Sequence, residues 1–177
     1  MIYLNGIKTT FVDFPNDEDL AVIVFFEGCS HNCKGCQNPQ LQNQINGYSK
    51  EDALNIIISQ CKKHNTNKIV FSGGDPYYPV NKDNLNDMLE IISYLESRGY
   101  TLCVYTGFNV EDILNLYKEK DNLIKPTFLK CGKFVEEHWR LSNKTDEVFV
   151  LASPNQNFYV RTEQGYEKIS TEGVLYF

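Results

Sequence analysis

Stretches of apolar residues alternate with amphipathic segments along this chain, and the alternation predicts its strands. Residues 20–26 form a nearly continuous apolar run, which is typical of a strand covered on both faces, as in a parallel sheet. The polar stretch 16–19 indicates a turn that separates this run from an earlier strand-like piece. Further strands are expected at 68–71, 100–105, 127–129 and 148–151.

Three amphipathic helices are expected between these strands. Ser49 is placed to cap the first, because its hydroxyl can accept from free backbone N–H groups and Asp52 follows three positions later. The second runs from about residue 85 to residue 98, and Gly99 is well placed to end it. The three apolar stripes are Leu54, Ile57, Ile58 and Cys61; Leu85, Met88, Leu89, Ile92 and Leu95; and Val110, Ile113, Leu114 and Tyr117.

The order of strands and helices predicts an α/β fold with a mostly parallel sheet, since such alternation implies right-handed crossovers. A closed eight-stranded barrel typically needs about 250 residues, and this chain has 177. We therefore expect a partial, incomplete βα barrel or an open sheet, in a single domain over residues 1–177 with C-terminal strands and tail from about 145. In either arrangement, sites gather at the carboxyl ends of the strands.

Composition changes this picture little, but charge removes one class of function. Hydrophobic residues make up 42% of the chain and charged residues 23%, as in ordinary soluble globular proteins. The net charge of −6 argues against a general affinity for nucleic acid, which needs a basic surface. The first residues lack the layout of a signal peptide, and no apolar run approaches the roughly 18 residues of a membrane span. We expect a cytoplasmic protein with no nucleic-acid or membrane partner.

The six cysteines are unevenly distributed, which indicates a metal site. Cys29, Cys33 and Cys36 form a CxxxCxxC group just after the apolar run. In the cytosol, clustered cysteines more often bind metal or do redox work than form disulfides. Thiolates are the usual ligands of iron–sulfur clusters, whereas structural zinc prefers four ligands, usually in two separated pairs. Three thiolates on a four-iron cluster would leave one iron open for chemistry.

Other candidates for a fourth ligand are weaker. Cys61 lies on a helix stripe and Cys103 within an apolar strand, so both are expected to be core thiols. Cys131 follows a strand candidate and precedes Gly132, which would place it near the mouth of the site. His31 lies inside the cysteine group and is expected to be a loop residue near the cluster rather than a ligand.

Several further segments accompany the cysteine group. In chain order, the whole set is Val12-Asp13-Phe14-Pro15, Phe26 to Pro39, Phe71-Ser72-Gly73-Gly74-Asp75-Pro76, Tyr105-Thr106-Gly107, Gly132-Lys133-Phe134 and Asn155-Gln156. These segments resemble the radical S-adenosylmethionine superfamily, with residues 28–39 as its cluster loop. Within it they resemble the activating enzymes of glycyl-radical proteins, above all the activators of anaerobic (class III) ribonucleoside-triphosphate reductase.

The resemblance implies two cofactors, a [4Fe–4S] cluster and S-adenosylmethionine, and a role for each matching residue. The implied site residues are Cys29, Cys33 and Cys36 for the cluster; Gly73, Gly74 and Asp75 for the methionine end of S-adenosylmethionine; and Gly35, Cys36 and Gln37 for its adenosyl part.

The implied activity is that of an oxidoreductase. A reduced donor such as flavodoxin would give the cluster one electron, and S-adenosylmethionine would be cleaved to methionine and a 5′-deoxyadenosyl radical. That radical would take a hydrogen atom from a glycine of its partner, anaerobic ribonucleoside-triphosphate reductase, and leave a glycyl radical there.

Three positions depart from the family pattern: Cys131 stands where an acidic residue is common, Asn157 where arginine often follows, and Asn16 where glycine is usual. These departures leave the cluster residues untouched and concern the partner-binding surface. Three alternative functions also stay open. One is another small radical enzyme of the superfamily, such as a pyruvate formate-lyase activator or a deazaguanine synthase. Another is an iron–sulfur electron carrier with Cys61, Cys103 or Cys131 as fourth ligand, and a third is a zinc-stabilised binding module.

Overall fold

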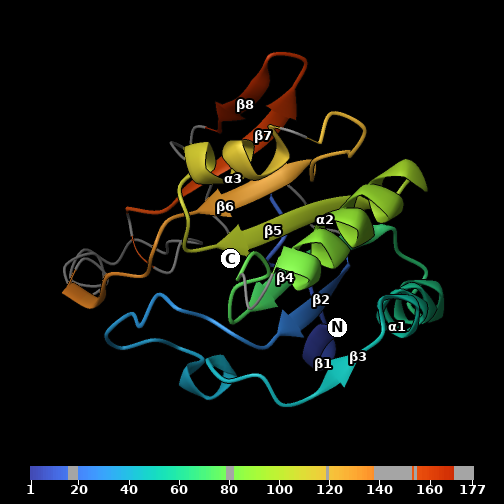
Figure 1. The fold of residues 1–177 in the computed structure, drawn as a ribbon, viewed down its shortest axis with the longest axis horizontal. Helices are drawn as coiled ribbons and strands as arrows, with labels where there is room; N and C mark the ends of the chain where they lie inside the picture. Colours follow the sequence, from blue (N-terminus) through green and yellow to red (C-terminus); the bar gives the residue numbers. More distant parts are fainter. Residues whose placement is uncertain (16–19, 79–81, 119, 138–152, 154, 170–177) are drawn as a thin grey trace.

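One sheet forms the centre of the protein in the computed structural model, which describes residues 1–15, 20–78, 82–118, 120–137, 153 and 155–169. Within these residues, eight strands pair in the order β3-β1-β2-β4-β5-β6-β7-β8 (Figure 1). The strands are β1 (Ile2–Thr10), β2 (Ala21–Phe26), β3 (Gly47–Tyr48), β4 (Lys68–Gly73), β5 (Thr101–Thr106), β6 (Phe128–Cys131), β7 (Asn157–Thr162) and β8 (Gly165–Lys168).

The middle of the sheet is parallel, as the sequence predicts. Strands β2, β4, β5 and β6 run parallel to one another, whereas β1 is antiparallel to β2 and β7 is antiparallel to β6. Strands β3 and β8 form the two edges. Antiparallel strands, rather than further strand–helix units, flank the parallel core. The sheet is not closed, so the barrel part of the expected fold is not confirmed.

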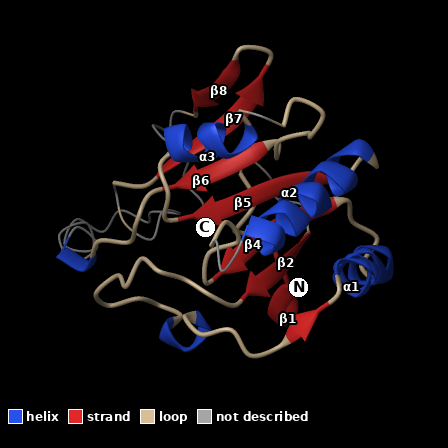
Figure 2. Cartoon of the chain, in the orientation of Figure 1, coloured by secondary structure: helices blue, strands red, loops and turns tan. Residues whose placement is uncertain are grey.

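Among the described residues, three α-helices cover one face of this sheet (Figure 2). They are α1 (Lys50–Lys63), α2 (Lys82–Ser97) and α3 (Val110–Tyr117), and a short 3-10 turn, η1 (Pro39–Leu41), precedes them. Ser49 caps α1 as predicted, because its hydroxyl oxygen accepts from the backbone N–H of Asp52 at 3.1 Å. Helix α2 begins earlier than expected and ends before Gly99, whose φ is +83°.

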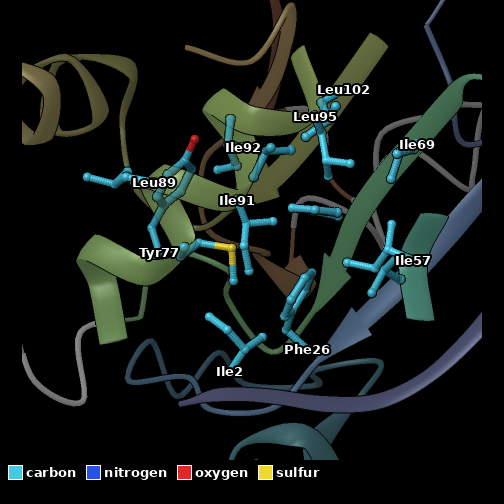
Figure 3. Packing of buried hydrophobic residues seen from close by; sticks show 14 of the residues in the cluster. Ile2, Phe26, Ile57, Ile69, Tyr77, Leu89, Ile91, Ile92, Leu95 and Leu102 are labelled. Atoms are coloured by element: carbon cyan, nitrogen blue, oxygen red, sulfur yellow. The ribbon is translucent and has the colours of Figure 1, made fainter. Parts of the chain in front are cut away.

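The main core lies between the helices and the sheet. Figure 3 shows Ile57 of α1 and Leu89 and Ile92 of α2 packed near the strand residues Phe26 and Ile69. All five side chains are buried. Because side chains alternate across a strand, this packing directs the remaining strand residues to the opposite face.

The opposite face carries a smaller core. It is formed by strand residues and by the chain after β1, and its buried members are Phe14, Ala21, Ile23, Val70, Cys103 and Phe158. Toward the carboxyl ends of the parallel strands, this face opens into a cavity.

Some predicted elements lie outside the described residues. They are the turn at 16–19 and the strand at 148–151, whereas the described part of the expected tail contains β7 and β8. The single-domain organisation over residues 1–177 stays a prediction. No helix in the described ranges has the length and apolarity that crossing a membrane requires.

Candidate functional site

A cavity of about 420 Å³ lies at the carboxyl ends of β2, β4, β5 and β6, where the fold class predicts a site. Three segments contribute to its walls: the cysteine loop (residues 28–39), the glycine motif (residues 73–76) and the segment after β6 (residues 132–137). Figure 1 shows the cysteine loop, in blue, extending beside the ends of these strands. Segments far apart in the sequence therefore meet at one place.

The three cysteines of the CxxxCxxC group line this cavity together. Their thiols are free and partly buried. Burial raises the pKa of the Cys29 thiol, and the nearby charges of Asp75, Cys33 and Cys36 raise it further. The backbone N–H of His31 acts in the opposite direction, by hydrogen bonding to Cys29. Cys33 and Cys36 are thus near enough to Cys29 to raise its pKa, as ligands of one group would be.

The cysteine arrangement suits a cluster. Within the described residues, no three histidine, cysteine, aspartate or glutamate side chains gather closely enough to hold a single metal ion. A four-iron cluster makes no such demand, because each thiolate binds a different iron atom and the sulfur atoms need not converge on one point. The three cysteines that line the cavity therefore fit this group.

Backbone hydrogen bonds shape the beginning of the cysteine loop. The N–H groups of Gly28 and Cys29 donate to the carbonyl oxygens of Leu41, at 2.8 Å, and Gln42, at 3.2 Å. The N–H of Asp75 donates to the carbonyl oxygen of Gly28 at 2.7 Å. These bonds tie the first residues of the loop to the chain that returns from it and to the glycine motif.

Gly73 and Gly74 line the cavity, and they also pack against the end of β2. A Cβ on Gly73 would lie 2.5 Å from the carbonyl oxygen of Phe26, and one on Gly74 would lie 2.3 Å from that of Gly28. The sequence interpretation explained these glycines by close approach to a ligand. The structure adds a second reason, since a larger residue would collide with the backbone of β2 and the cysteine loop.

Asp75 connects three of the segments around the cavity. Its carboxylate is 2% exposed and accepts from Nε2 of His31 at 2.7 Å, from the hydroxyl of Thr106 at 2.9 Å and from the N–H of Gly107 at 2.9 Å. The N–H of Tyr77 donates to it at 3.0 Å. Asp75 itself is not among the cavity-lining residues. The contact with S-adenosylmethionine that was expected of Asp75 stays a prediction.

Cys36 and Gln37 line the cavity, whereas their neighbour Gly35 does not. Gly35 has a φ of +71°, and a Cβ there would lie 3.0 Å from the Cδ of Glu136. Nζ of Lys34 also lies 3.8 Å from Oε2 of Glu136. The segment after β6 thus packs against the cysteine loop at this point. The adenosyl contact expected of Gly35 stays a prediction.

The other three cysteines are buried residues that do not line the cavity. Cys61 and Cys103 have no exposed surface, and Cys131 is 4% exposed. Burial raises the pKa of Cys61 to about 11 and that of Cys131 to about 12. Cys131 therefore lies in the core at the end of β6 rather than at the mouth of the site. None of the three is placed as a fourth cysteine ligand, which the electron-carrier alternative requires.

Glu27 directly precedes the cysteine loop, and the sequence interpretation gave it no role. Its carboxylate is 4% exposed and accepts from the N–H groups of Ile45, at 2.6 Å, and Asn46, at 2.9 Å. The side-chain amide of Asn5 donates to it at 3.1 Å. Burial raises the pKa of this carboxyl, but the hydrogen bonds outweigh burial and lower it overall. The feature of the sequence that could have indicated a role for Glu27 is a carboxylate directly after a buried strand.

Lys130 and Asp13 also line the cavity without having been assigned a role. Lys130 is 6% exposed, and its Nζ lies 4.3 Å from the centre of the Tyr105 ring. Burial lowers the pKa of Lys130 to about 8, and the charges of Cys103 and Asp13 partly oppose this shift. The feature of the sequence that could have indicated a role for Lys130 is a lysine inside a short strand that is otherwise apolar.

Comparison with known proteins agrees with the cysteine site. The model of the family described as a 4Fe-4S single cluster domain matches residues 17–157. Three similar proteins are each named anaerobic ribonucleoside-triphosphate reductase-activating protein. The one from Salmonella typhi is 30% identical over 130 residues, covering 71% of this chain and 82% of that protein. The one from Enterobacteria phage T4 is 29% identical over 123 residues, covering 67% and 77%. The one from Escherichia coli strain K12 is 28% identical over 131 residues, covering 71% and 82%.

Among solved structures, QueE from Escherichia coli is 18% identical to this chain, covers 60% of it with 53% of its own length, and has a TM-score of 0.48. That likeness is too weak to bear on fold or function. The family match is stronger, because it spans most of the chain and includes both the cysteine loop and the glycine motif. The chain belongs to the 4Fe–4S single cluster domain family and to that of the anaerobic ribonucleoside-triphosphate reductase-activating proteins.

Proposed function

We propose that this protein holds a [4Fe–4S] cluster on Cys29, Cys33 and Cys36, binds S-adenosylmethionine beside it, and activates an anaerobic ribonucleoside-triphosphate reductase by forming a glycyl radical on it. When bound, the two groups supply the chemistry: one electron cleaves the sulfonium to methionine and a 5′-deoxyadenosyl radical, which takes a hydrogen atom from a glycine Cα. The names of the similar proteins support the choice of partner.

One observation carries the proposal. Three free cysteines of the loop after β2 and both glycines at the end of β4 line the same cavity at the carboxyl ends of parallel strands. Thiolates are ligands for iron, and the half-buried backbone carbonyl groups of Gly73 and Gly74 would be acceptors for the amino group of a cofactor next to the iron. Each of the two implied cofactors thus has residues of suitable chemistry in the cavity wall.

In this proposal, the remaining residues bind and position S-adenosylmethionine. Gly35, Cys36 and Gln37 would run along the adenosyl part, and Gln37 lines the cavity. Asp75 would face the methionine end while its carboxylate holds the cysteine loop through His31. Such positioning fixes the distance between the cluster and the bond to be cleaved.

A reduced protein such as flavodoxin is the proposed electron donor. The three cysteines are partly exposed, so a cluster bound to them would lie near enough to the surface for a docked donor to reduce it. We place this reaction in the cytoplasm, where thiols are kept reduced.

The proposal is tested with the full chain, reconstituted anaerobically with iron and sulfide. Dithionite and S-adenosylmethionine are added, and 5′-deoxyadenosine is measured by chromatography. We expect product from the wild type and none from Cys29→Ala, Cys33→Ala or Cys36→Ala, each with less bound iron. Cys61→Ala is the matched control, because its thiol is buried in the core, and it should keep both iron and activity. A fully loaded cluster that gives no 5′-deoxyadenosine, even with the reductase present, would refute the proposal.

The partner is tested separately by electron paramagnetic resonance. We expect a glycyl-radical signal when the reductase of the same organism is added, and none when that glycine is replaced by alanine. A glycyl-radical signal on pyruvate formate-lyase instead would show that the protein is a pyruvate formate-lyase activator of the same superfamily.

A further inference from the structure

A row of side chains crosses the sheet at the floor of the cavity. The register pairs Phe25 with Ser72, Tyr105 with Lys130, and Lys130 with Phe158. The register of β4 with β5 ends one residue before Ser72 and Tyr105, and its continuation by one residue places Ser72 beside Tyr105. We call these five residues the floor row, and all of them except Phe158 line the cavity.

Lys130 is the charged member of the floor row. It is 6% exposed, and its Nζ lies 4.3 Å from the ring centre of Tyr105 and 5.9 Å from that of Phe158. In the described part of the chain, no carboxylate forms an ion pair with it. Its ammonium makes cation–π contacts with these two rings, and such contacts offset the cost of partial burial only in part. The position therefore fits a donor whose acceptor comes with a ligand.

The position of Lys130 on β6 separates it from the proposed cofactor walls. The cysteine loop follows β2 and the glycine motif follows β4, whereas Lys130 lies two strands beyond β4. Neighbouring strands are about 4.8 Å apart, which places Lys130 roughly 10 Å further across the sheet. A molecule that reaches Lys130 therefore lies over β5 and β6, next to a cofactor held by Gly73 and Gly74.

The charge around Lys130 favours a neutral acceptor. Asp13 lines the same cavity and is close enough to influence Lys130 electrostatically. A carboxylate ligand would be attracted by Lys130 but repelled by Asp13. A carbonyl oxygen accepts from the ammonium without that repulsion.

We propose that Lys130 is a substrate-binding residue, whose Nζ donates a hydrogen bond to a backbone carbonyl oxygen of the peptide segment that carries the reacting glycine. This inference rests on the proposed function. A glycine has no side chain to be recognised, so its segment must be held through peptide groups and through its neighbours. Tyr105, whose ring lies beside the ammonium and lines the cavity, gives that segment an aromatic surface to lie on.

The test compares Lys130→Met, which keeps an unbranched side chain but lacks the terminal donor, with a substitution at a control lysine. Lys125→Met is the matched control, because Nζ of Lys125 lies 5.6 Å from the ring centre of Tyr117 and the residue does not line the cavity. The probe is a synthetic peptide with blocked ends, centred on the radical-forming glycine of the reductase. Its dissociation constant is measured by fluorescence anisotropy on the cluster-loaded protein, and that of S-adenosylmethionine by equilibrium dialysis.

We expect Lys130→Met to weaken peptide binding by about tenfold or more, as the loss of a charged hydrogen bond does. Affinity for S-adenosylmethionine should stay within about twofold, and Lys125→Met should match the wild type in both assays. Lys130→Gln keeps an N–H donor and should recover part of the affinity for the peptide.

Three results would overturn the proposal: unchanged peptide binding by Lys130→Met, loss of S-adenosylmethionine affinity in its place, or failure of both Lys130 variants to fold, which would assign Lys130 to the core. Formation of 5′-deoxyadenosine by the wild type tests the proposed function independently. If that product is absent while peptide binding depends on Lys130, the cleavage chemistry fails and the peptide site stands. If that product forms while the wild type does not bind the peptide, the peptide site fails alone.

Discussion

The Nε2 atom of His31 lies 2.7 Å from a carboxylate oxygen of Asp75, although 44 residues separate the two in the chain. This contact joins the cysteine loop to the glycine motif. The hydroxyl of Thr106 and the N–H of Gly107 bind the same carboxylate, so the end of β5 is held by it as well. One buried side chain therefore fixes the relative positions of three segments that surround the cavity.

Asp75→Asn is expected to destabilise the protein by about 2–3 kcal/mol, because a buried acceptor is replaced by an amide that leaves at least one donor unpaired. The amide nitrogen that the substitution introduces would face His31, Thr106 or Gly107, all of which donate to Asp75. Urea unfolding of the cluster-free protein measures the effect. Asp121→Asn, at an exposed turn, is the control and should change the free energy of unfolding by less than about 0.5 kcal/mol. Equal stability of the two variants would show that Asp75 does not hold the segments together.

Gly74→Ala is expected to disrupt the junction between the glycine motif and the cysteine loop. Its Cβ would lie 2.3 Å from the carbonyl oxygen of Gly28 and 2.8 Å from that of Leu41, and both atoms belong to the backbone. The melting temperature and the iron content after reconstitution should both fall. Gly6→Ala introduces the same methyl group where nothing lies within 4 Å, and it should load iron like the wild type. A Gly74→Ala protein with normal iron content would contradict the tight packing at this junction.

Glu27→Gln is expected to lower stability at neutral pH, with a loss that depends on pH. The pKa of Glu27 is lowered in the folded state, so its carboxylate stabilises the protein above the ordinary glutamate pKa near 4.5. That contribution is lost as the pH falls below 4.5 toward the folded-state pKa. We expect a difference from the wild type of about 1–3 kcal/mol at pH 7 that shrinks at pH 4, measured by urea unfolding. Glu163→Gln, at an exposed position, is the control and should show no such trend. A difference in unfolding free energy between Glu27→Gln and the wild type that does not change with pH would be evidence against the lowered pKa.

Lys130 should make wild-type stability increase at alkaline pH relative to Lys130→Met. The pKa of Lys130 is lowered from 10.5 to about 8, so between these values the unfolded state binds more protons than the folded state. The cost of burying the charge is thus present in full below pH 8 and fades as the pH rises to 10.5. Urea unfolding at pH 7 and pH 9.5 should show wild-type stability rising against the variant by up to about 1.4 kcal/mol per pH unit within that window. Subtracting the variant removes the opposing titration of Cys61 and Cys131, and a flat difference would mean that Lys130 is solvated in the folded state.

The parallel core was predictable because each of its elements leaves a local pattern. The apolar run at 20–26 became β2, and the stripe of Val110, Ile113 and Tyr117 became the buried face of α3. The edges were harder to predict, since the paired residues of β7 and β8 mix apolar with polar side chains and most of them are half-exposed. Their antiparallel direction depends on how the connecting segments run through space, and no local sequence pattern indicates this.

The cavity was predictable in outline for a related reason. Cys29, Cys33, Cys36, Gly73 and Gly74 follow strands whose parallel direction brings their ends to one edge of the sheet. The buried charges were not predictable, because a single lysine or glutamate in a strand faces the core or the solvent according to register. Pairing with both neighbouring strands determines which face each residue takes, and that information is not local.

The hydrogen bonds that shape the cysteine loop are made within the polypeptide itself. Gly28 and Cys29 donate to the returning chain, and Glu27 holds the residues that follow it. A cluster destroyed by oxygen would therefore leave the beginning of its binding loop tied in place, ready for new iron to be inserted. In a protein built for oxygen-sensitive chemistry, damage of this kind would be repaired by reloading the existing molecule rather than by synthesis of a new one.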